Sequence, residues 1–291
     1  MTSYTAVVNP AAGRGAGARV AAELVAALPR GSVEVVAGRD GGHAGELARA
    51  AAAAGRTVLA VGGDGHASTV AGAVARADGL LGIVPVGRGN DFARQLGLPT
   101  DAPGAAAVVT GGHERTVDVI DAAGRTVLGS VYTGVDSAAS EIVATRPRVP
   151  GGAVYRYAAV RALLTSRPAG FRLTLDGVEW AERGWSVVVA NSGWYGAGMH
   201  IVPSAEVDDG LLDVLMIRDS SRWTLLAALR QVYDGSHVGR ADVEVRRARA
   251  VAVTADRPLP VHADGEPLAS GSVTVTVRPA ALRVLVPSPV G

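Results

Sequence analysis

The stretch Thr57–Ala77, TVLAVGGDGHASTVAGAVARA, decides the fold. It begins with an apolar run, Thr57–Val61, which predicts a buried strand, and it ends in an alanine-rich stretch, Ala67–Ala77, which predicts a helix. Between them, Gly62–Gly65 holds three glycines in four residues, so the backbone can approach a ligand closely. The amides that open the following helix favour a phosphate group. The loop is also compatible with a plain strand–helix turn in which Asp64 caps the helix.

The same alternation of strand and helix fills the first third of the chain. Strands are predicted at Ala6–Asn9, Val33–Val36, Thr57–Val61 and Leu81–Pro85, and helices at Ala18–Leu28, Ala44–Ala54, Ala67–Ala77 and Asp101–Thr110. This order is typical of a parallel sheet with helices on both faces. The sequence therefore predicts an N-terminal α/β domain.

The pattern changes after about Thr116, where short strands separated by turn residues become dense. They are expected at Val117–Ile120, Thr126–Tyr132, Phe171–Leu175, Trp185–Ala190, Leu212–Ile217, Val243–Val245, Ala250–Thr254 and Ser272–Val277. Helical patterns interrupt them at Tyr155–Ser166 and Arg222–Tyr233. Many strands with few helices predict a second, all-β domain of sandwich-like or barrel-like form.

Composition excludes several functions. The net charge of +1 over 291 residues argues against a nucleic-acid binder, and the absence of cysteine excludes disulfides and thiolate sites. All 28 basic residues are arginine, so a phosphate-binding or Schiff-base lysine is excluded. There is no secretory signal and no apolar run long enough to span a membrane, which fits an intracellular location.

Two further glycine-rich loops follow predicted strands. Asn9–Gly15 continues into Gly13–Ala18, a weak match to the dinucleotide fingerprint that leaves an NAD-dependent oxidoreductase open. Its Arg14 can reach phosphate oxygens. The loop Pro85–Arg94 opens a helix, with Asn90 or Asp91 as its N-cap. Three such loops meet at the carboxyl edge of a parallel sheet, which predicts a nucleotide site.

These motifs together resemble the catalytic domain of diacylglycerol, sphingosine and ceramide kinases. The similarity rests on Asn9-Pro10-x-x-Gly13, Gly62-Gly63-Asp64-Gly65, Pro85-x-Gly87-x-Gly89-Asn90-Asp91, Pro203-x-Ala205-x-x-Asp208-Asp209-Gly210-x-x-Asp213 and Asp264-Gly265-Glu266. It covers nearly the whole chain. It implies a phosphofructokinase-like ATP-binding domain at 1–117, to which 281–291 returns, and an all-β lipid domain at 118–280.

The resemblance also implies roles for single residues. The ATP-binding set would be Asn9, Pro10, Gly13, Arg14, Gly62, Gly63, Gly65, His66, Arg88, Asn90 and Asp118. Asp64 would lie near the phosphates and Mg²⁺. Glu266 would accept the proton of the lipid hydroxyl, with Asp264 close by. Asp209 and the main-chain carbonyls of Glu206 and Leu211 would hold a structural Mg²⁺. Carboxylate and carbonyl oxygens are the ligands that this hard cation prefers.

The chain departs from the family pattern at three positions. His66, Ala12 and Arg88 stand where the family has threonine, serine and threonine. Arg88 could replace a hydroxyl contact with a charge-assisted one, and His66 could cap or stack. The departures leave open a catalytically impaired module that binds nucleotide or lipid.

Lipid-facing residues are expected on the helix Tyr155–Ser166 and on one loop. The candidates are Tyr155, Tyr157, Val160, Leu163 and Leu164, the arginines Arg156 and Arg161, and the loop residues Trp194 and Tyr195. Core packing explains the helix equally well. The sequence therefore predicts an ATP- and Mg²⁺-dependent lipid kinase acting on diacylglycerol, cytoplasmic and peripheral to the membrane. A kinase of another lipid alcohol remains the alternative, and a homodimer is compatible with the resemblance.

Overall fold

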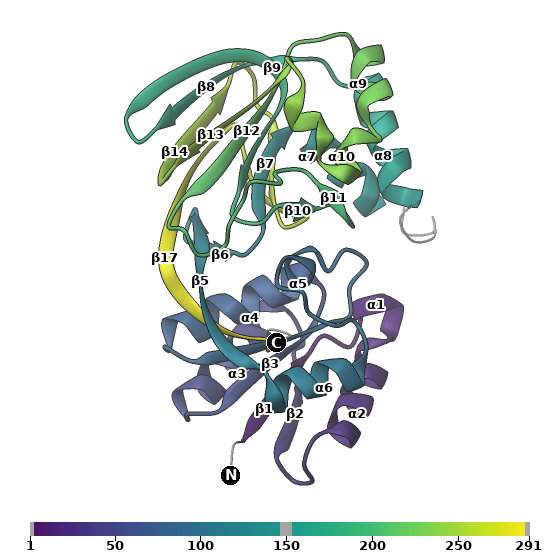
Figure 1. The fold of residues 1–291 in the computed structure, drawn as a ribbon, viewed down its shortest axis with the longest axis vertical. Coiled ribbons are helices and arrows are strands. Elements are labelled where there is room, and N and C mark those ends of the chain that lie inside the picture. Colours follow the sequence, from purple (N-terminus) through teal and green to yellow (C-terminus); the bar gives the residue numbers. More distant parts are fainter. Residues whose placement is uncertain (1–2, 146–152, 289–291) are drawn as a thin grey trace. The chain divides into compact units, whose positions relative to one another are not determined.

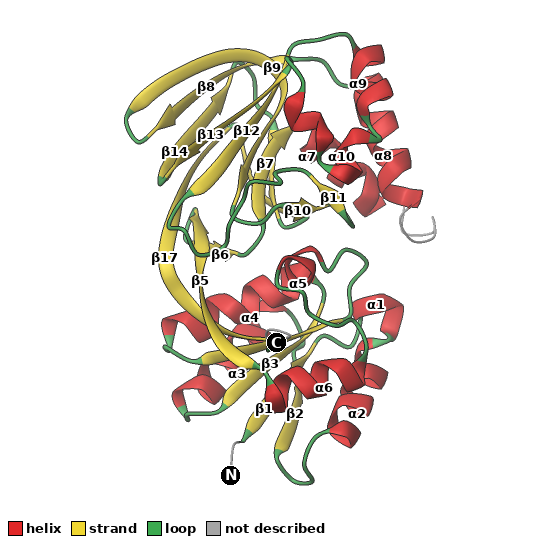
Figure 2. Ribbon diagram, viewed as in Figure 1, coloured by secondary structure: helices red, strands yellow, loops and turns green. Residues whose placement is uncertain are grey.

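The computed structural model describes residues 3–145 and 153–288. The chain divides into two compact units, residues 1–119 with 279–291, and residues 120–278 (Figure 1). The first unit is α/β and the second is built mainly of strands with four helices at one side (Figure 2). The predicted fold class is thereby confirmed, with more helix in the second unit than an all-β domain would hold.

The first unit is a parallel sheet in the order β4-β3-β1-β2. Both faces of β1 are buried. Ala6 and Val8 share one face and pack in a core cluster with Leu24 of α2, and Val7 on the other face is also fully buried. Such burial requires cover on both faces. Helices α2 and α6 contact each other, as do α3 and α4. The bounds are β1 Tyr4–Val8, α1 Ala12–Gly15, α2 Gly17–Ala27, β2 Val33–Ala37, α3 Gly41–Ala53, β3 Thr57–Gly62, α4 Asp64–Arg76, β4 Leu80–Pro85, α5 Asp91–Gln95 and α6 Ala102–Gly111.

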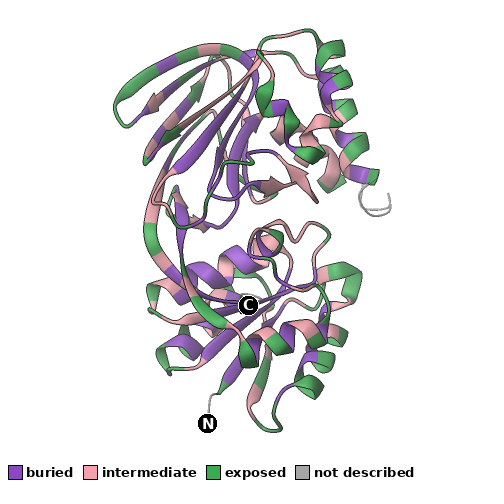
Figure 3. Cartoon of the chain, viewed as in Figure 1, coloured by how far each residue is buried: buried purple, intermediate pink, exposed green. Residues whose placement is uncertain are grey.

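The second unit is organised around one long strand, β9 (Val178–Ala190). Its first half pairs antiparallel with β8, and its second half pairs with β7 on one side and β12 on the other. The buried faces of these strands form the main core of the unit (Figure 3). Strand β5 (His113–Ala122) begins in the first unit and ends in the second. The other strands are β6 Arg125–Val127, β7 Ser130–Gly134, β8 Ala169–Leu175, β10 Trp194–Tyr195, β11 Met199–His200, β12 Leu212–Arg218, β13 Val243–Ala248, β14 Ala250–Ala255, β15 Pro260–Ala263 and β16 Glu266–Ser270.

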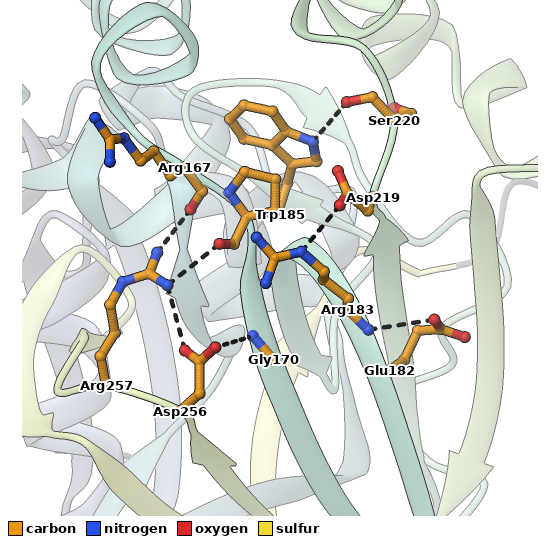
Figure 4. A network of polar contacts seen from close by, with 10 residues as sticks. Arg167, Gly170, Glu182, Arg183, Trp185, Asp219, Ser220, Asp256 and Arg257 are labelled. Atoms are coloured by element: carbon orange, nitrogen blue, oxygen red, sulfur yellow. Dashed lines mark hydrogen bonds and ion pairs between the residues drawn. The ribbon is translucent and has the colours of Figure 1, made fainter.

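Helices cover one side of this unit. Leu163 of α8 and Leu225 of α9 pack with Val135 of α7 against Trp185 of β9. The Trp185 indole donates a hydrogen bond to the Ser220 carbonyl at 3.0 Å, within the polar network of Figure 4. The bounds are α7 Val135–Thr145, α8 Ala153–Thr165, α9 Arg222–Ala228, α10 Gln231–Asp234 and a 3₁₀ turn at Ser236–Gly239.

The last strand, β17 (Ser272–Val286), belongs to both units. It pairs antiparallel with β14 at its start and parallel with β4 at Arg283 and Val284. Ala280 adopts a positive φ of 49°, and its amide donates to the Asp118 carboxylate at 2.7 Å. The final segment thus pairs with the first sheet.

Two predicted elements are each divided in two in the structure. The strand expected at Thr126–Tyr132 is broken between β6 and β7, where the amides of Leu128 and Gly129 turn toward Asp264. The helix expected at Arg222–Tyr233 is two short helices with different partners, since α9 packs on α8 and α10 packs on β11.

Candidate functional site

The three glycine-rich loops of the first unit come together at the carboxyl ends of β1, β3 and β4. A Cβ placed on Gly87 would lie 2.8 Å from the Cα of Gly63, and one on Gly13 would lie 2.8 Å from the Val86 carbonyl oxygen. Backbone therefore meets backbone in all three loops, which leaves no room for side chains there. The structure brings together the loops that the sequence predicted to converge.

The first loop needs glycine for conformation as well as for space. Gly13 adopts φ +58°, and a Cβ on Gly17 would approach the Asn9 carbonyl oxygen to 2.2 Å. The Asn9 side chain accepts the Ala11 amide at 3.1 Å, which shapes the turn after β1. Pro10 and Arg14 are exposed at the surface of this loop.

Two carboxylates converge beside the second and third loops. A Cβ on Gly89 would lie 2.8 Å from Asp91 Oδ2 and 2.9 Å from Asp64 Oδ2. Asp64 is the first residue of α4 and Asp91 the first residue of α5, and the Phe92 amide donates to Asp64 Oδ1 at 3.3 Å. Paired carboxylate oxygens next to helix N-termini suit a hard cation that carries phosphate. The sequence considered Asp91 only as an N-cap, so this partner of Asp64 was missed.

Asn90 shapes the third loop. Its backbone is left-handed at φ +53°, and its amide side chain both accepts from the Gly87 amide at 2.7 Å and donates to the Gly87 carbonyl at 3.2 Å. The neighbouring Arg88 is exposed. The loop thus holds its own form and presents a guanidinium at its tip.

His66 forms a hydrogen bond to the sheet of the first unit. Its Nε2 lies 2.9 Å from the Val7 carbonyl of β1, so this nitrogen donates, and the ring lies against Gly62. Burial lowers the pKa of His66, which favours the neutral ring. The histidine that replaces the family's threonine therefore links α4 to β1, a role other than the capping or stacking that the sequence suggested.

Asp264 and Glu266 lie on the turn between β15 and β16 in the second unit. The Asp264 carboxylate accepts the backbone amides of Leu128 at 3.1 Å, Gly129 at 3.1 Å and Ser130 at 2.9 Å. Glu266 is exposed. The motif therefore pairs an aspartate that organises the loop before β7 with a glutamate that faces outward.

A polar cluster lies on the helix-covered face of the same sheet. The Asp136 carboxylate accepts the hydroxyls of Ser186 and, at 2.8 Å, of Tyr195. Tyr132 packs edge-on against Tyr195 and shares a hydrogen bond of 2.8 Å with Ser140. Burial raises the pKa of Asp136 and of Tyr132, so the tyrosine stays protonated. The sequence placed Tyr195 at a membrane interface, but its hydroxyl is held inside this cluster.

His262 joins this cluster to the Asp-Gly-Glu turn. Its ring stacks on Tyr132 with centroids 6.1 Å apart, and burial is the main cause of its lowered pKa. The charges of Glu141 and Glu266 act in the opposite direction. A neutral imidazole therefore stands within the electrostatic reach of the predicted base.

Helix α8, which was expected to face lipid, buries some of its apolar side chains and exposes others. Val154, Ala158 and Leu163 of α8 are buried, whereas Tyr157 and Leu164 are each 42% exposed. Arg156, Arg161 and Val160 are exposed as well, and Tyr155 is partly buried. The Trp194 ring stacks on the His200 ring, with the two centroids 4.0 Å apart. Within the described part of the chain, no helix is long and apolar enough to cross a membrane.

The predicted metal turn contains a cation of its own. The Asp209 carboxylate forms an ion pair with Arg247 of β13, and Asp209 Oδ1 accepts the Leu211 amide at 3.0 Å. Across residues 3–145 and 153–288, no group of three or more acidic or histidine side chains is arranged to hold a metal ion. The Asp209 carboxylate is therefore engaged by Arg247, and a Mg²⁺ held by Asp209 with the main-chain carbonyls of Glu206 and Leu211 stays a prediction.

Comparisons with known proteins find family models that match both units of this chain. Residues 3–122 match the family model of the diacylglycerol kinase catalytic domain, and residues 129–286 match the YegS C-terminal NAD kinase beta sandwich-like domain. A diacylglycerol kinase of Mycobacterium tuberculosis is 38% identical over 97% of this chain and 94% of its own length. A probable lipid kinase of Pseudomonas fluorescens, described as YegS-like, is 32% identical over 85% of this chain and 83% of its own. The crystal structure of a diacylglycerol kinase from Bacillus anthracis shares the fold, with a TM-score of 0.74 and 21% identity over 99% of this chain and 97% of that one.

Proposed function

Since this chain belongs to the diacylglycerol kinase-like lipid kinases, we propose that it transfers the γ-phosphoryl group of ATP to the hydroxyl of diacylglycerol, giving phosphatidic acid. The observation that carries the proposal is the meeting of the Asp64 and Asp91 carboxylates at Gly89. Phosphoryl transfer needs positioning and neutralisation of charge more than covalent chemistry, and this arrangement offers both.

The first unit supplies the donor side of the reaction. Backbone amides at the N-termini of α4 and α5 would bind phosphate oxygens. The exposed guanidiniums of Arg14 and Arg88 add positive charge in a chain without lysine. Asp64 and Asp91 would hold the Mg²⁺ of MgATP, since their oxygens already face one small space. A Mg²⁺ held by these two carboxylates would neutralise charge on the transferred group.

The second unit supplies the acceptor side. Glu266, exposed on its turn, would take the proton from the lipid hydroxyl. Asp264 would act by fixing the turn, because its carboxylate is already held by the amides of residues 128–130. A base of this kind contributes roughly 10²–10⁴-fold in rate.

The proposed function also places the protein in the cytoplasm, peripherally bound to the membrane that holds its lipid substrate. Tyr157 and Leu164 expose apolar surface on α8, and Arg156 and Arg161 expose positive charge on the same helix. Apolar side chains beside arginines suit the interface of an anionic bilayer. These exposed side chains support the proposal that α8 binds the membrane.

The test is transfer of labelled γ-phosphate from ATP to lipids in mixed micelles with Mg²⁺. The acceptors are diacylglycerol, monoacylglycerol, ceramide, sphingosine and undecaprenol. Product with diacylglycerol that is lost in Asp91→Asn and Glu266→Gln, and kept in Asp78→Asn and Glu179→Gln, supports the proposal. The control residues are exposed carboxylates away from the three loops and from the Asp-Gly-Glu turn. Product with another lipid alone would correct the substrate.

A further inference from the structure

An arginine faces the acidic turn that leads into β12. Arg247 lies directly across from Asp213 in the antiparallel pairing of β12 with β13. Its guanidinium forms an ion pair with the Asp209 carboxylate, and its Nε lies 3.7 Å from Asp213 Oδ2. One guanidinium therefore bridges two carboxylates that stand four positions apart on the turn.

These carboxylates need a positive partner. The Asp213 side chain is 2% exposed and that of Asp209 is 18% exposed, and buried carboxylates are costly unless they are paired. The Ser204 hydroxyl donates to Asp213 Oδ1 at 2.7 Å, which satisfies one oxygen but supplies no charge. Arg247 supplies the missing charge.

We propose that Arg247 is the resident cation of this turn and takes the structural place of a divalent metal. A planar guanidinium can contact two carboxylates at once, as a metal ion does, and it is permanently charged. Because Arg247 is fixed to β13, folding itself delivers the cation. The second unit then needs no metal ion to hold the turn before β12.

The proposal is tested without nucleotide or lipid, so it stands or fails separately from the kinase activity. Thermal unfolding of the full chain is followed after treatment with EDTA and again with millimolar Mg²⁺. The expected result is that Mg²⁺ changes the Tm of the wild type and of Asp209→Asn by the same amount. A rise of Tm with Mg²⁺ that is absent from Asp209→Asn would overturn the proposal, because it would place a metal at this turn.

Substitution of the arginine gives the second arm. Arg247→Gln is expected to lower Tm by roughly 5 °C or more, because it leaves Asp209 and Asp213 without their cation. The matched control is Arg246→Gln on the same strand, where the arginine is 41% exposed and contacts Glu244 and the Trp180 ring. Its Tm should fall less. Equal Tm values for the two variants would contradict the role of Arg247.

A binding measurement covers the case in which Arg247→Gln does not fold. Mn²⁺ is titrated into the nucleotide-free wild-type protein and into Asp209→Asn, and bound ion is counted by electron paramagnetic resonance. The two proteins should bind Mn²⁺ alike. Stoichiometric binding by the wild type that Asp209→Asn loses would assign the turn to a metal and refute the proposal.

Discussion

Asp64 and Asp91 open two different helices, yet their carboxylate oxygens lie within 2.9 Å of one point beside Gly89. Like charges at this separation repel, so the pair is stable only with a cation or with hydrogen-bond donors nearby. The Phe92 amide supplies one such donor to Asp64. The arrangement is expected of a site that binds Mg²⁺ together with phosphate.

Asp91→Asn should therefore impair catalysis as severely as Asp64→Asn. The amide keeps the shape of the side chain but removes one of the two charges, and we expect a loss of kcat of about 10²-fold or more. The half-saturating Mg²⁺ concentration should also rise. Both values come from Mg²⁺ titrations at saturating ATP, with Asp78→Asn as the control. Wild-type kinetics for Asp91→Asn would remove this residue from the site.

Gly89→Ala tests the same space from the backbone side. The added Cβ would stand 2.8 Å from Asp91 Oδ2 and 2.9 Å from Asp64 Oδ2, so both carboxylates must move. Displacement by about 1 Å at a reacting centre can cost roughly 10²-fold in rate. The control is Gly111→Ala, where a Cβ meets nothing within 4 Å. Tm should change little in either variant, and retained activity in Gly89→Ala would show that the space is not used.

Substitutions of the two acidic residues in the Asp-Gly-Glu turn should have different effects, one on stability and the other on turnover. Asp264→Asn puts an NH₂ group where backbone amides now donate, so it should lower the free energy of unfolding by roughly 1–3 kcal/mol. Glu266→Gln changes an exposed side chain and should leave stability unaltered while reducing turnover about 10²–10⁴-fold. Urea unfolding and initial rates measure the two effects. A stable but inactive Asp264→Asn would instead give Asp264 a direct part in the chemistry.

His66 should contribute to the dependence of stability on pH. Burial lowers its folded-state pKa below the ordinary histidine value of 6.5, so the unfolded chain binds the proton more tightly. The stability that comes from the neutral ring is present above pH 6.5 and is lost as the pH falls through the folded pKa. Between about pH 7 and pH 5, wild-type protein should lose more unfolding free energy than His66→Gln. His113→Gln, at an exposed position, should follow the wild type. Parallel curves for wild type and His66→Gln would refute this role.

The sequence predicted the first unit well because its signals are local. Strands β1, β3 and β4 are buried on both faces, so each reads as a largely apolar run, and a glycine-rich loop follows it. The topology of parallel strands then brings the loops to one edge without further information. The convergence of Gly13, Gly63 and Gly87 follows from that rule.

Features that depend on distant pairing could not be predicted in the same way. The break between β6 and β7 is caused by Asp264, which lies far along the chain. The contact of Arg247 with Asp209 depends on the register of β12 with β13, which a local pattern does not define. Asp91 was missed because the N-cap role already explained its type and position. Helix α7 was missed because few of its residues are buried, so its apolar period is weak.

The measurement that tests the account most directly is transfer of labelled γ-phosphate from ATP to micellar diacylglycerol in the presence of Mg²⁺. The account predicts labelled phosphatidic acid from the wild type, little from Asp91→Asn or Glu266→Gln, and normal amounts from Asp78→Asn and Glu179→Gln. Absence of labelled product from the wild type with every lipid of the panel, despite measurable binding of ATP, would contradict the claim that this chain is an active lipid kinase.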